Sequence, residues 1–197
     1  MDIDWNHELV DQLEWHWNGK ARPRLDGLTD DEYRWEPVPG CWSVRPRSEA
    51  TSAMATGAGD VVIDYALPEP VPAPFTTIAW RLGHLSIDVF GTRTANHFGD
   101  GGVSYETVDM PLTAKGGLAL LDHWHDAWVT GVRGLGAEGL ARPCGPHEGP
   151  FADYPMAALV LHISREAIHH AAEISLLRDL YVHQPARADD PTGDASR

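Results

Sequence analysis

Apolar residues recur every three or four positions in four long segments of the chain, the spacing expected for one buried face of an α-helix. In the first segment, residues 4–20, the repeating positions are Trp5, Leu9, Leu13 and Trp17. The other three segments predicted to be helical cover residues 76–98, 113–135 and 155–182. Four long amphipathic helices predict an all-α fold, and their number favours a four-helix bundle.

The segments between the predicted helices are rich in proline and glycine, which interrupt regular structure. The connection from the first to the second helix is much longer than a tight turn requires, so we expect a long crossover connection there. Within it, Thr29 is expected to cap a short helical turn, and VVIDYAL, from Val61, is expected to form a short strand or an extended stretch. We expect residues 1–183 to form the bundle and residues 184–197 to form a flexible tail.

Length and charge limit the classes of function. A chain of 197 residues is sufficient for one domain with a substantial core. Its formal net charge of -14 would repel a phosphate backbone and an anionic membrane surface, so we expect neither nucleic acid nor a membrane as a partner. Eight tryptophans indicate a well-packed interior or an aromatic pocket. For Trp42, core packing is expected and a place at a pocket mouth is the alternative.

The cysteine content and the start of the chain favour a cytoplasmic protein. Cys41 and Cys144 are expected to be free thiols, because disulfide frameworks use more cysteines in shorter chains. The opening MDIDWNHELV has no basic region followed by an apolar run, which argues against a signal peptide. No apolar run approaches the roughly 18 residues of a membrane-spanning helix.

The last predicted helix carries five titratable residues along one arc of an otherwise apolar segment. Adjacent helical residues are rotated by about 100°, so His162, Glu166, His169, His170 and Glu173 all fall within roughly 100° of one another. Their flanks are Ala, Ile and Leu, which indicates a buried helix, and burying a carboxylate without a partner is costly. A divalent metal ion would satisfy such a group, with neutral imidazoles supplying nitrogen ligands.

On this arc His162 with Glu166, and Glu166 with His170, have the four-residue spacing of helical metal sites. The same spacing is common on solvated helix faces without a metal, so spacing alone leaves both interpretations open. A third ligand is available on the second predicted helix, where His84 lies among apolar residues; the alternative is a core histidine. His162 is either a rival ligand or a base near a bound water.

The remaining histidines and charged residues are assigned to supporting positions. His169 is expected to form a hydrogen bond or a helix contact rather than to bind metal. Glu173 is expected either to orient a ligand imidazole or to form a salt bridge with Arg81 or Arg178. His125, on the third helix, is expected at the surface, with an approach to the pocket as the alternative.

Three stretches of the sequence resemble motifs of the DinB-like superfamily of metal-binding four-helix bundles: CWSVRP, TTIAWRLGHL and REAIHHAAEISLLRDLY. The resemblance covers residues 5–182, and the superfamily also holds the mycothiol-dependent maleylpyruvate isomerase and bacillithiol transferase types. By this resemblance the metal ligands are His84, Glu166 and His170. Many relatives have three histidines, and the glutamate resembles the mycothiol-isomerase branch instead. The stretch 48–74 departs from a typical compact member.

The resemblance implies a metal-dependent enzyme acting on a small molecule, of the thiol S-transferase, isomerase or hydrolase type. His162 is the expected catalytic residue, accepting a proton from a metal-activated thiol or water. Zinc is the first metal expected, with nickel, iron and manganese as alternatives, and a low-molecular-weight thiol is the expected second cofactor. A homodimer is also implied. Two alternatives are a metal- or ligand-binding stress or sensor bundle without turnover, and a purely structural helical dimer.

Overall fold

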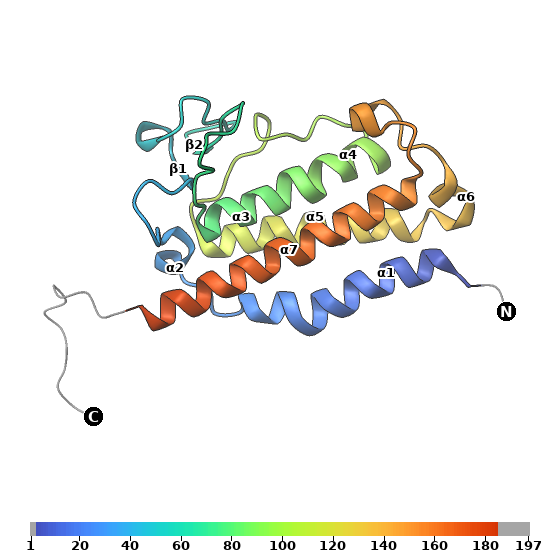
Figure 1. Cartoon of the computed structure of the whole chain (residues 1–197), viewed down its shortest axis with the longest axis horizontal. Coiled ribbons are helices and arrows are strands. Elements are labelled where there is room, and N and C mark those ends of the chain that lie inside the picture. The colour runs from blue at the N-terminus through green and yellow to red at the C-terminus, as the bar shows by residue number, and fades with distance from the viewer. Residues whose placement is uncertain (1–2, 185–197) are drawn as a thin grey trace, which may run out of the picture.

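Four long helices lie side by side and form the body of the molecule (Figure 1). The structure, a computed structural model, describes residues 3–184, so the predicted tail at 184–197 lies outside this range apart from Gln184. The long helices are α1 (Trp5–His16) with a π-helical extension (Trp17–Ala21), α3 (Ile78–His84) continued by a π-helical segment (Leu85–Gly91) and α4 (Thr92–Phe98), α5 (Ala114–Arg133) and α7 (Met156–His183). The predicted all-α bundle is confirmed.

Three of the four long helices begin at a capping side chain, and at α1 it is Asp4, whose carboxylate accepts a hydrogen bond from the His7 amide. The hydroxyl of Thr77 accepts a hydrogen bond from the Trp80 amide, and the hydroxyl of Thr113 accepts one from the Gly116 amide. Each cap satisfies a backbone donor of the first turn that has no partner within the helix. The predicted helix starts therefore lie within two residues of the observed ones.

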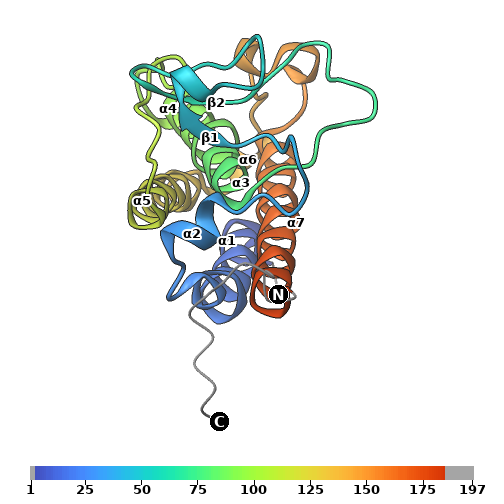
Figure 2. The same cartoon turned by 90° about the vertical axis from the view of Figure 1, so that its left-hand side faces the viewer.

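The connection between α1 and α3 contains most of the short elements. Helix α2 (Asp30–Arg34) follows the predicted cap, Thr29, whose hydroxyl accepts a hydrogen bond from the Glu32 amide. Strands β1 (Val44–Pro46) and β2 (Val61–Ile63) pair antiparallel and lie over α3 (Figure 2), so the predicted short strand is confirmed. The remaining short helical elements are Arg22–Leu25, Arg47–Glu49, α6 (Gly136–Ala141) and Pro146–Phe151.

Asp64, directly after β2, holds parts of this connection together through hydrogen bonds. Its fully buried carboxylate accepts hydrogen bonds from the backbone amides of Ser43, Thr51 and Ser52, each at 3.1 Å, and from the Arg45 guanidinium at 2.9 Å. A buried carboxylate is stable when several donors satisfy it. One side chain therefore holds segments on both sides of β1 in place.

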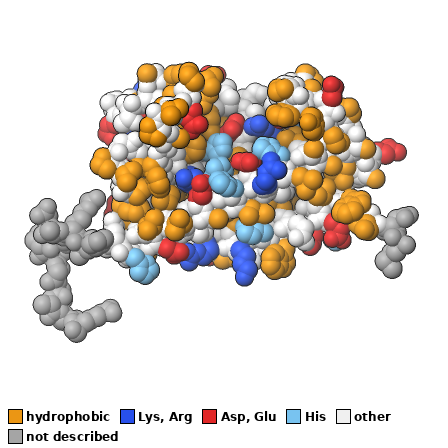
Figure 3. Space-filling view, in the orientation of Figure 1, with side chains coloured by type: hydrophobic (Ala, Val, Ile, Leu, Met, Phe, Trp, Pro, Cys, Tyr) orange, Lys and Arg blue, Asp and Glu red, His pale blue; other side chains and the backbone are white. Residues whose placement is uncertain are grey.

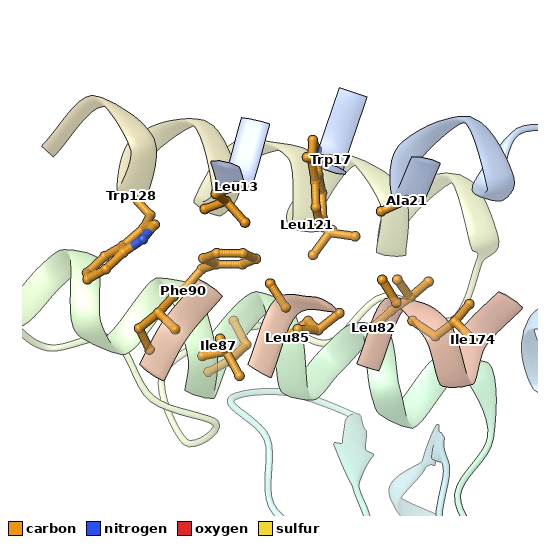
Figure 4. Close-up of a cluster of buried hydrophobic side chains, with 14 of the residues drawn as sticks. Leu13, Trp17, Ala21, Leu82, Leu85, Ile87, Phe90, Leu121, Trp128 and Ile174 are labelled. Atoms are coloured by element: carbon orange, nitrogen blue, oxygen red, sulfur yellow. The ribbon is translucent and has the colours of Figure 1, made fainter. Parts of the chain in front are cut away.

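Large apolar side chains from the long helices meet in the core (Figure 4). Trp17, in the extension of α1, packs edge-on against Phe90 with ring centroids 5.9 Å apart, and Trp128 of α5 is fully buried. The predicted stripe of the first helix is correct at Leu13 and Trp17, which are buried, but wrong at Trp5, which is 63% exposed. Trp5 is the first residue of α1 and lies at the end of the bundle, where the helix has fewer neighbours.

The crossover connection lies between the second and third long helices, not between the first and second as predicted. Helix α2, which follows α1, contacts the start of α5. The Tyr33 hydroxyl donates to the Pro111 carbonyl at 2.9 Å, and the Ala114 amide donates to the Asp30 carboxylate at 2.8 Å. Helices α3 and α5 therefore begin at the same end, and residues 99–113 run back along the bundle (Figure 1). An extended chain covers about 3.3 Å per residue against about 1.5 Å in a helix, so this shorter connection suffices.

Helix α7 is exposed along one side, although its composition predicted burial nearly all round. Leu161, Ile168 and Leu176 are exposed, whereas Ile163 and Ile174 are buried. The prediction was wrong because a helix in a four-helix bundle keeps an outer face beyond its contacts with neighbouring helices. Within the described residues, no helix has both the length and the apolar character needed to cross a membrane.

Candidate metal centre

His84, Glu166 and His170 meet on one side of the bundle, and we call them the three-residue cluster. One potential ligand atom from each lies within 4.8 Å of the other two. His84 comes from the last position of α3, and Glu166 and His170 lie one turn apart on α7. Figure 3 shows histidine, acidic and basic side chains gathered in the middle of this face. The cluster thus joins donors from two helices that are distant in sequence.

Helix geometry places the cluster at the boundary between core and solvent. Ile163, Ala167 and Ala171 turn toward the core and are buried, so the four-residue steps that carry Glu166 and His170 fall beside that buried face. The side chain of Glu166 is 29% exposed and that of His170 is 12% exposed. A metal ion held here would be shielded on the core side and open to a small molecule on the other.

The Nδ1 atoms of both imidazoles already have partners. Nδ1 of His170 lies 2.7 Å from a carboxylate oxygen of Glu173, which also forms an ion pair with Arg81. Nδ1 of His84 lies 3.1 Å from the hydroxyl of Tyr105. Partners at one ring nitrogen fix the orientation of an imidazole and leave the other nitrogen for a metal. In both residues that nitrogen is Nε2, and the Nε2 of His170 faces Glu166 at 3.7 Å.

Both imidazoles are neutral at pH 7. Burial is the main cause that lowers the pKa of His170 to about 3, and the nearby Arg81 guanidinium contributes to it. Burial also lowers the pKa of His84, against the opposing effect of the nearby carboxylates of Asp88 and Glu166. A neutral imidazole has a free lone pair, which is the form that binds metal. The cluster therefore needs no deprotonation of histidine to accept a cation.

The carboxylate of Glu166, unlike the two imidazoles, lacks a close hydrogen-bonding partner in the described part of the chain. Within residues 3–184 it accepts no hydrogen bond, and its nearest polar neighbours are the imidazoles of His162 and His170, each at 3.7 Å. A half-buried carboxylate without donors is poorly solvated. A divalent cation would supply the missing charge, and a set of two imidazole nitrogens and one carboxylate oxygen is a common metal-binding set. The residues present fit a metal ion.

His162 lies one turn before Glu166 but outside the three-residue cluster. Its side chain is 42% exposed, and Arg165 donates a hydrogen bond to its Nδ1 at 2.9 Å. His169 is more exposed, at 61%, and lies 3.3 Å from Glu173. A second possible ligand group, His169 with His170 and Glu173, shares one imidazole with the first. Because Arg81 already neutralises Glu173, this second group is the weaker candidate.

His125 is neither at the surface nor in the site, contrary to both sequence-based expectations. It is 3% exposed and stacks on Trp17 with ring centroids 4.1 Å apart and planes 8° apart. Phe90 approaches its edge, with centroids 5.5 Å apart. The third helix turns this position inward, where aromatic residues of two other helices enclose it.

Tyr105 is the main site residue that the sequence analysis missed. Burial, followed by the negative charge of Asp88, raises the pKa of Tyr105 well above its ordinary value, so its hydroxyl stays protonated. It reaches His84 from the crossover connection, in a stretch without helical or strand periodicity. No spacing in the sequence identifies it, because its position depends on the path of a loop.

A cavity of about 730 Å³ lies beside His84. Its lining includes Trp42, Trp80 and Tyr105, so Trp42 both packs in the core and borders a pocket, as its two expectations allowed. A second cavity, of about 750 Å³, lies near α2 and contains no residue of the three-residue cluster. The first cavity therefore borders the cluster at His84, whereas Glu166 and His170 are not part of its lining.

Comparison with known proteins agrees with this architecture. A family profile described as the DinB superfamily matches residues 12–174, a range that includes all three residues of the cluster. The matched range is well over half of the chain and extends into all four long helices. No curated protein and no solved structure matches the chain significantly.

Proposed function

Because the chain belongs to the DinB superfamily, we propose that it is a metal-dependent enzyme in which His84, Glu166 and His170 hold one divalent cation. The observation that carries this proposal is the convergence of the three side chains, with potential ligand atoms within 4.8 Å of one another. Two histidines and one carboxylate leave coordination positions free, as catalytic metal sites do. The cavity beside His84 supports access by a small molecule.

Zinc is the first candidate for the cation. A site of two imidazoles and one carboxylate is familiar for catalytic zinc, and it also serves iron, nickel and manganese. The cation supplies Lewis acidity, which lowers the pKa of a bound thiol or water and generates a nucleophile at neutral pH. Elemental analysis of protein purified without added metal distinguishes these metals.

The protein residues would orient the ligands and move the proton. Glu173, itself held by Arg81, keeps the His170 ring in one orientation, and Tyr105 does the same for His84. His162 is our proposed proton acceptor, because it lies one helical turn from Glu166 and its side chain is 42% exposed. Proton release to solvent would then be possible without passage through the core.

The reaction we propose is transfer of a thiol sulfur, isomerisation or hydrolysis of a small molecule, with a low-molecular-weight thiol as the expected cosubstrate for the first two. Thiol consumption with generic electrophiles tests the transfer reaction, and product analysis tests isomerisation and hydrolysis, each in the presence and absence of a chelator. We expect activity that the chelator abolishes and that the matching metal restores. His169→Ala is the control variant, because this exposed side chain lies beside the cluster on α7.

A result with stoichiometric metal and no turnover of any thiol or water reaction would instead support the alternative, a metal- or ligand-binding sensor bundle. Absence of bound metal in both the native protein and His170→Ala would reject the metal site itself. Melting temperature separates the two cases. A bound cation stabilises the folded state by mass action, so a chelator lowers the melting temperature only if the site is occupied.

We also propose that the protein is a cytoplasmic homodimer. Cys41 and Cys144 are buried and free, which agrees with a reducing compartment. Trp5 and Trp15 of α1 are each more than 60% exposed, and exposed tryptophans are enriched at protein interfaces. Light scattering of the purified protein measures the oligomeric state, and a monomeric mass at working concentration contradicts the dimer.

A further inference from the structure

The cavity beside His84 has a lining that points to a class of ligand. Its volume of about 730 Å³ is within the range of small-molecule sites. Its walls come from α3 and from both long connections, so it lies outside the bundle core. Aromatic and aliphatic side chains make much of the lining: Trp42, Trp80, Tyr65, Tyr105, Met54 and Leu67.

The aromatic part of this lining is held in place by the protein itself. The indole nitrogen of Trp80 donates a hydrogen bond to the Asp64 carbonyl at 2.9 Å, and its ring stacks on His84 with centroids 5.2 Å apart. Trp42 lies next to it, with centroids 6.2 Å apart and planes inclined by 34°. Tyr105 is tied to His84 through its hydroxyl. Rings already fixed in position lose little conformational entropy when a ligand binds.

The charged residues of the lining all have the same sign. Glu69, Asp88 and Glu106 border the cavity, and none of the described residues that line it is lysine or arginine. Asp88 is paired with Arg93 at 3.2 Å, whereas Glu69 and Glu106 are exposed and form no ion pair within the described part of the chain. The net charge of -14 adds to the negative potential at the cavity.

We propose that this cavity binds a small organic cation, an amine with an aromatic or aliphatic body. The indole and phenol rings provide both apolar contact and attraction for a cation, and the carboxylates of Glu69 and Glu106 complete the recognition. In the metal-free protein, an anionic ligand would meet repulsion, because none of the described residues that line the cavity is lysine or arginine. That the amine is the substrate rests on the function proposed above, because His84 belongs to both sites. Binding of the amine to the cavity is independent of that function.

Three probes of similar shape and different charge test this inference: phenethylamine, 2-phenylethanol and phenylacetate. Isothermal titration calorimetry at low ionic strength measures their dissociation constants. We expect phenethylamine to bind about tenfold more tightly than 2-phenylethanol, the factor expected for a cation among aromatic rings and carboxylates. We expect no measurable binding of phenylacetate to the metal-free protein.

The double substitution Glu69→Gln with Glu106→Gln removes the two unpaired carboxylates. Both side chains are exposed, so the fold should be kept, and circular dichroism checks it. The preference for phenethylamine over 2-phenylethanol should fall to less than about threefold. The matched control, Glu8→Gln with Glu138→Gln, changes the net charge equally at exposed positions outside the cavity and should keep the preference.

Equal or tighter binding of 2-phenylethanol or phenylacetate would overturn the inference, and so would an equal loss of preference in the control variant. Repeating the titrations with His170→Ala separates this inference from the proposed function. Amine preference that persists in native protein containing no metal supports the cavity and rejects the metal enzyme. Bound metal and turnover without amine preference support the metal enzyme and reject amine binding in the cavity.

Discussion

His170 and His125 are both largely buried, and burial lowers the pKa of both, yet their surroundings differ. Nε2 of His170 faces the Glu166 carboxylate at 3.7 Å, and its Nδ1 is held by Glu173. The ring of His125 instead lies flat against Trp17, and its buried Nε2 has no hydrogen-bond partner in the described structure. Burial and a low pKa are therefore insufficient to indicate a metal site. What distinguishes His170 from His125 is that other potential ligands, among them the negatively charged Glu166, converge on it.

Both regions also contain or adjoin π-helical backbone, so this feature does not distinguish the candidate metal site from the aromatic cluster. His84 immediately precedes the π-helical segment 85–91, and the neighbours of His125 lie in π-helical turns as well, Trp17 in one and Phe90 in the other. Such turns are rare and frequently found at functional sites. In this molecule they serve a donor cluster in one place and aromatic packing in the other.

The largest expected difference between the two regions is in metal content. His170→Ala removes one of the three proposed ligands, and we expect the affinity for zinc to fall at least about 100-fold. His125→Phe should retain native affinity, because its ring takes part in no donor cluster. Competition with a zinc-binding dye measures both. Equal loss of zinc in the two variants would remove the distinction between these histidines.

A smaller effect is expected for the residues that hold the ligand rings. Tyr105→Phe and Glu173→Ala each remove the partner of an Nδ1 atom and should weaken metal binding by about 10- to 100-fold. The matched change near His125, Asp126→Asn, alters the partner of its Nδ1 and should leave metal binding unchanged. An unaltered affinity in Tyr105→Phe would mean that the hydroxyl does not orient His84.

Trp17→Phe should affect stability but not the metal site. The substitution removes part of the ring that stacks on His125 and packs against Phe90, and we expect a loss of about 1–2 kcal/mol in the free energy of unfolding. Urea unfolding measures the loss, and zinc affinity serves as the control readout. A large drop in zinc affinity would show that the two regions are coupled.

The smallest expected effect is on the pH dependence of stability. Burial lowers the pKa of His125 below the value of about 6.5 in an unfolded chain. Below that pH the unfolded chain binds more protons, so the free energy of unfolding falls as the pH falls. His125→Phe should make the decline between pH 7 and 5 shallower, by at most about 1.4 kcal/mol per pH unit.

Urea unfolding of metal-free protein at several pH values measures this difference. His84 and His170 have lowered pKa values too, and they titrate in both proteins, so subtraction isolates His125. Identical slopes in the native protein and in His125→Phe would contradict the assignment of a neutral, buried imidazole at this position.

The sequence was sufficient to predict the long helices because their periodicity and threonine caps are local. It placed Glu166 and His170 on one side of the last helix for the same reason, since a four-residue step on a helix fixes their relative direction. The crossover was placed in the wrong connection because connection length does not reveal where α2 docks. That depends on contacts such as Tyr33 with Pro111, far apart in the chain.

Local sequence patterns also could not predict the positions of residues that depend on several helices or on the path of a loop. His125 was expected at the surface because the residues that enclose it, Trp17 and Phe90, come from other helices. Tyr105 and the cavity lining lie in irregular connections, where the positions of side chains follow from packing rather than from spacing. The candidate ligands could be named from the sequence, but residues that contact them from a loop, such as Tyr105, could not.

The anchoring of the first connection by Asp64 has an evolutionary consequence. The carboxylate is satisfied by groups at positions 43, 45, 51 and 52, none of which lines the cavity beside His84. Residues 54–56 and 65–67, which do line it, are therefore free to vary in sequence while the attachment point stays intact. Descendants of such a chain could acquire new ligand preferences by loop substitution alone, with the helices and the three-residue cluster inherited unchanged.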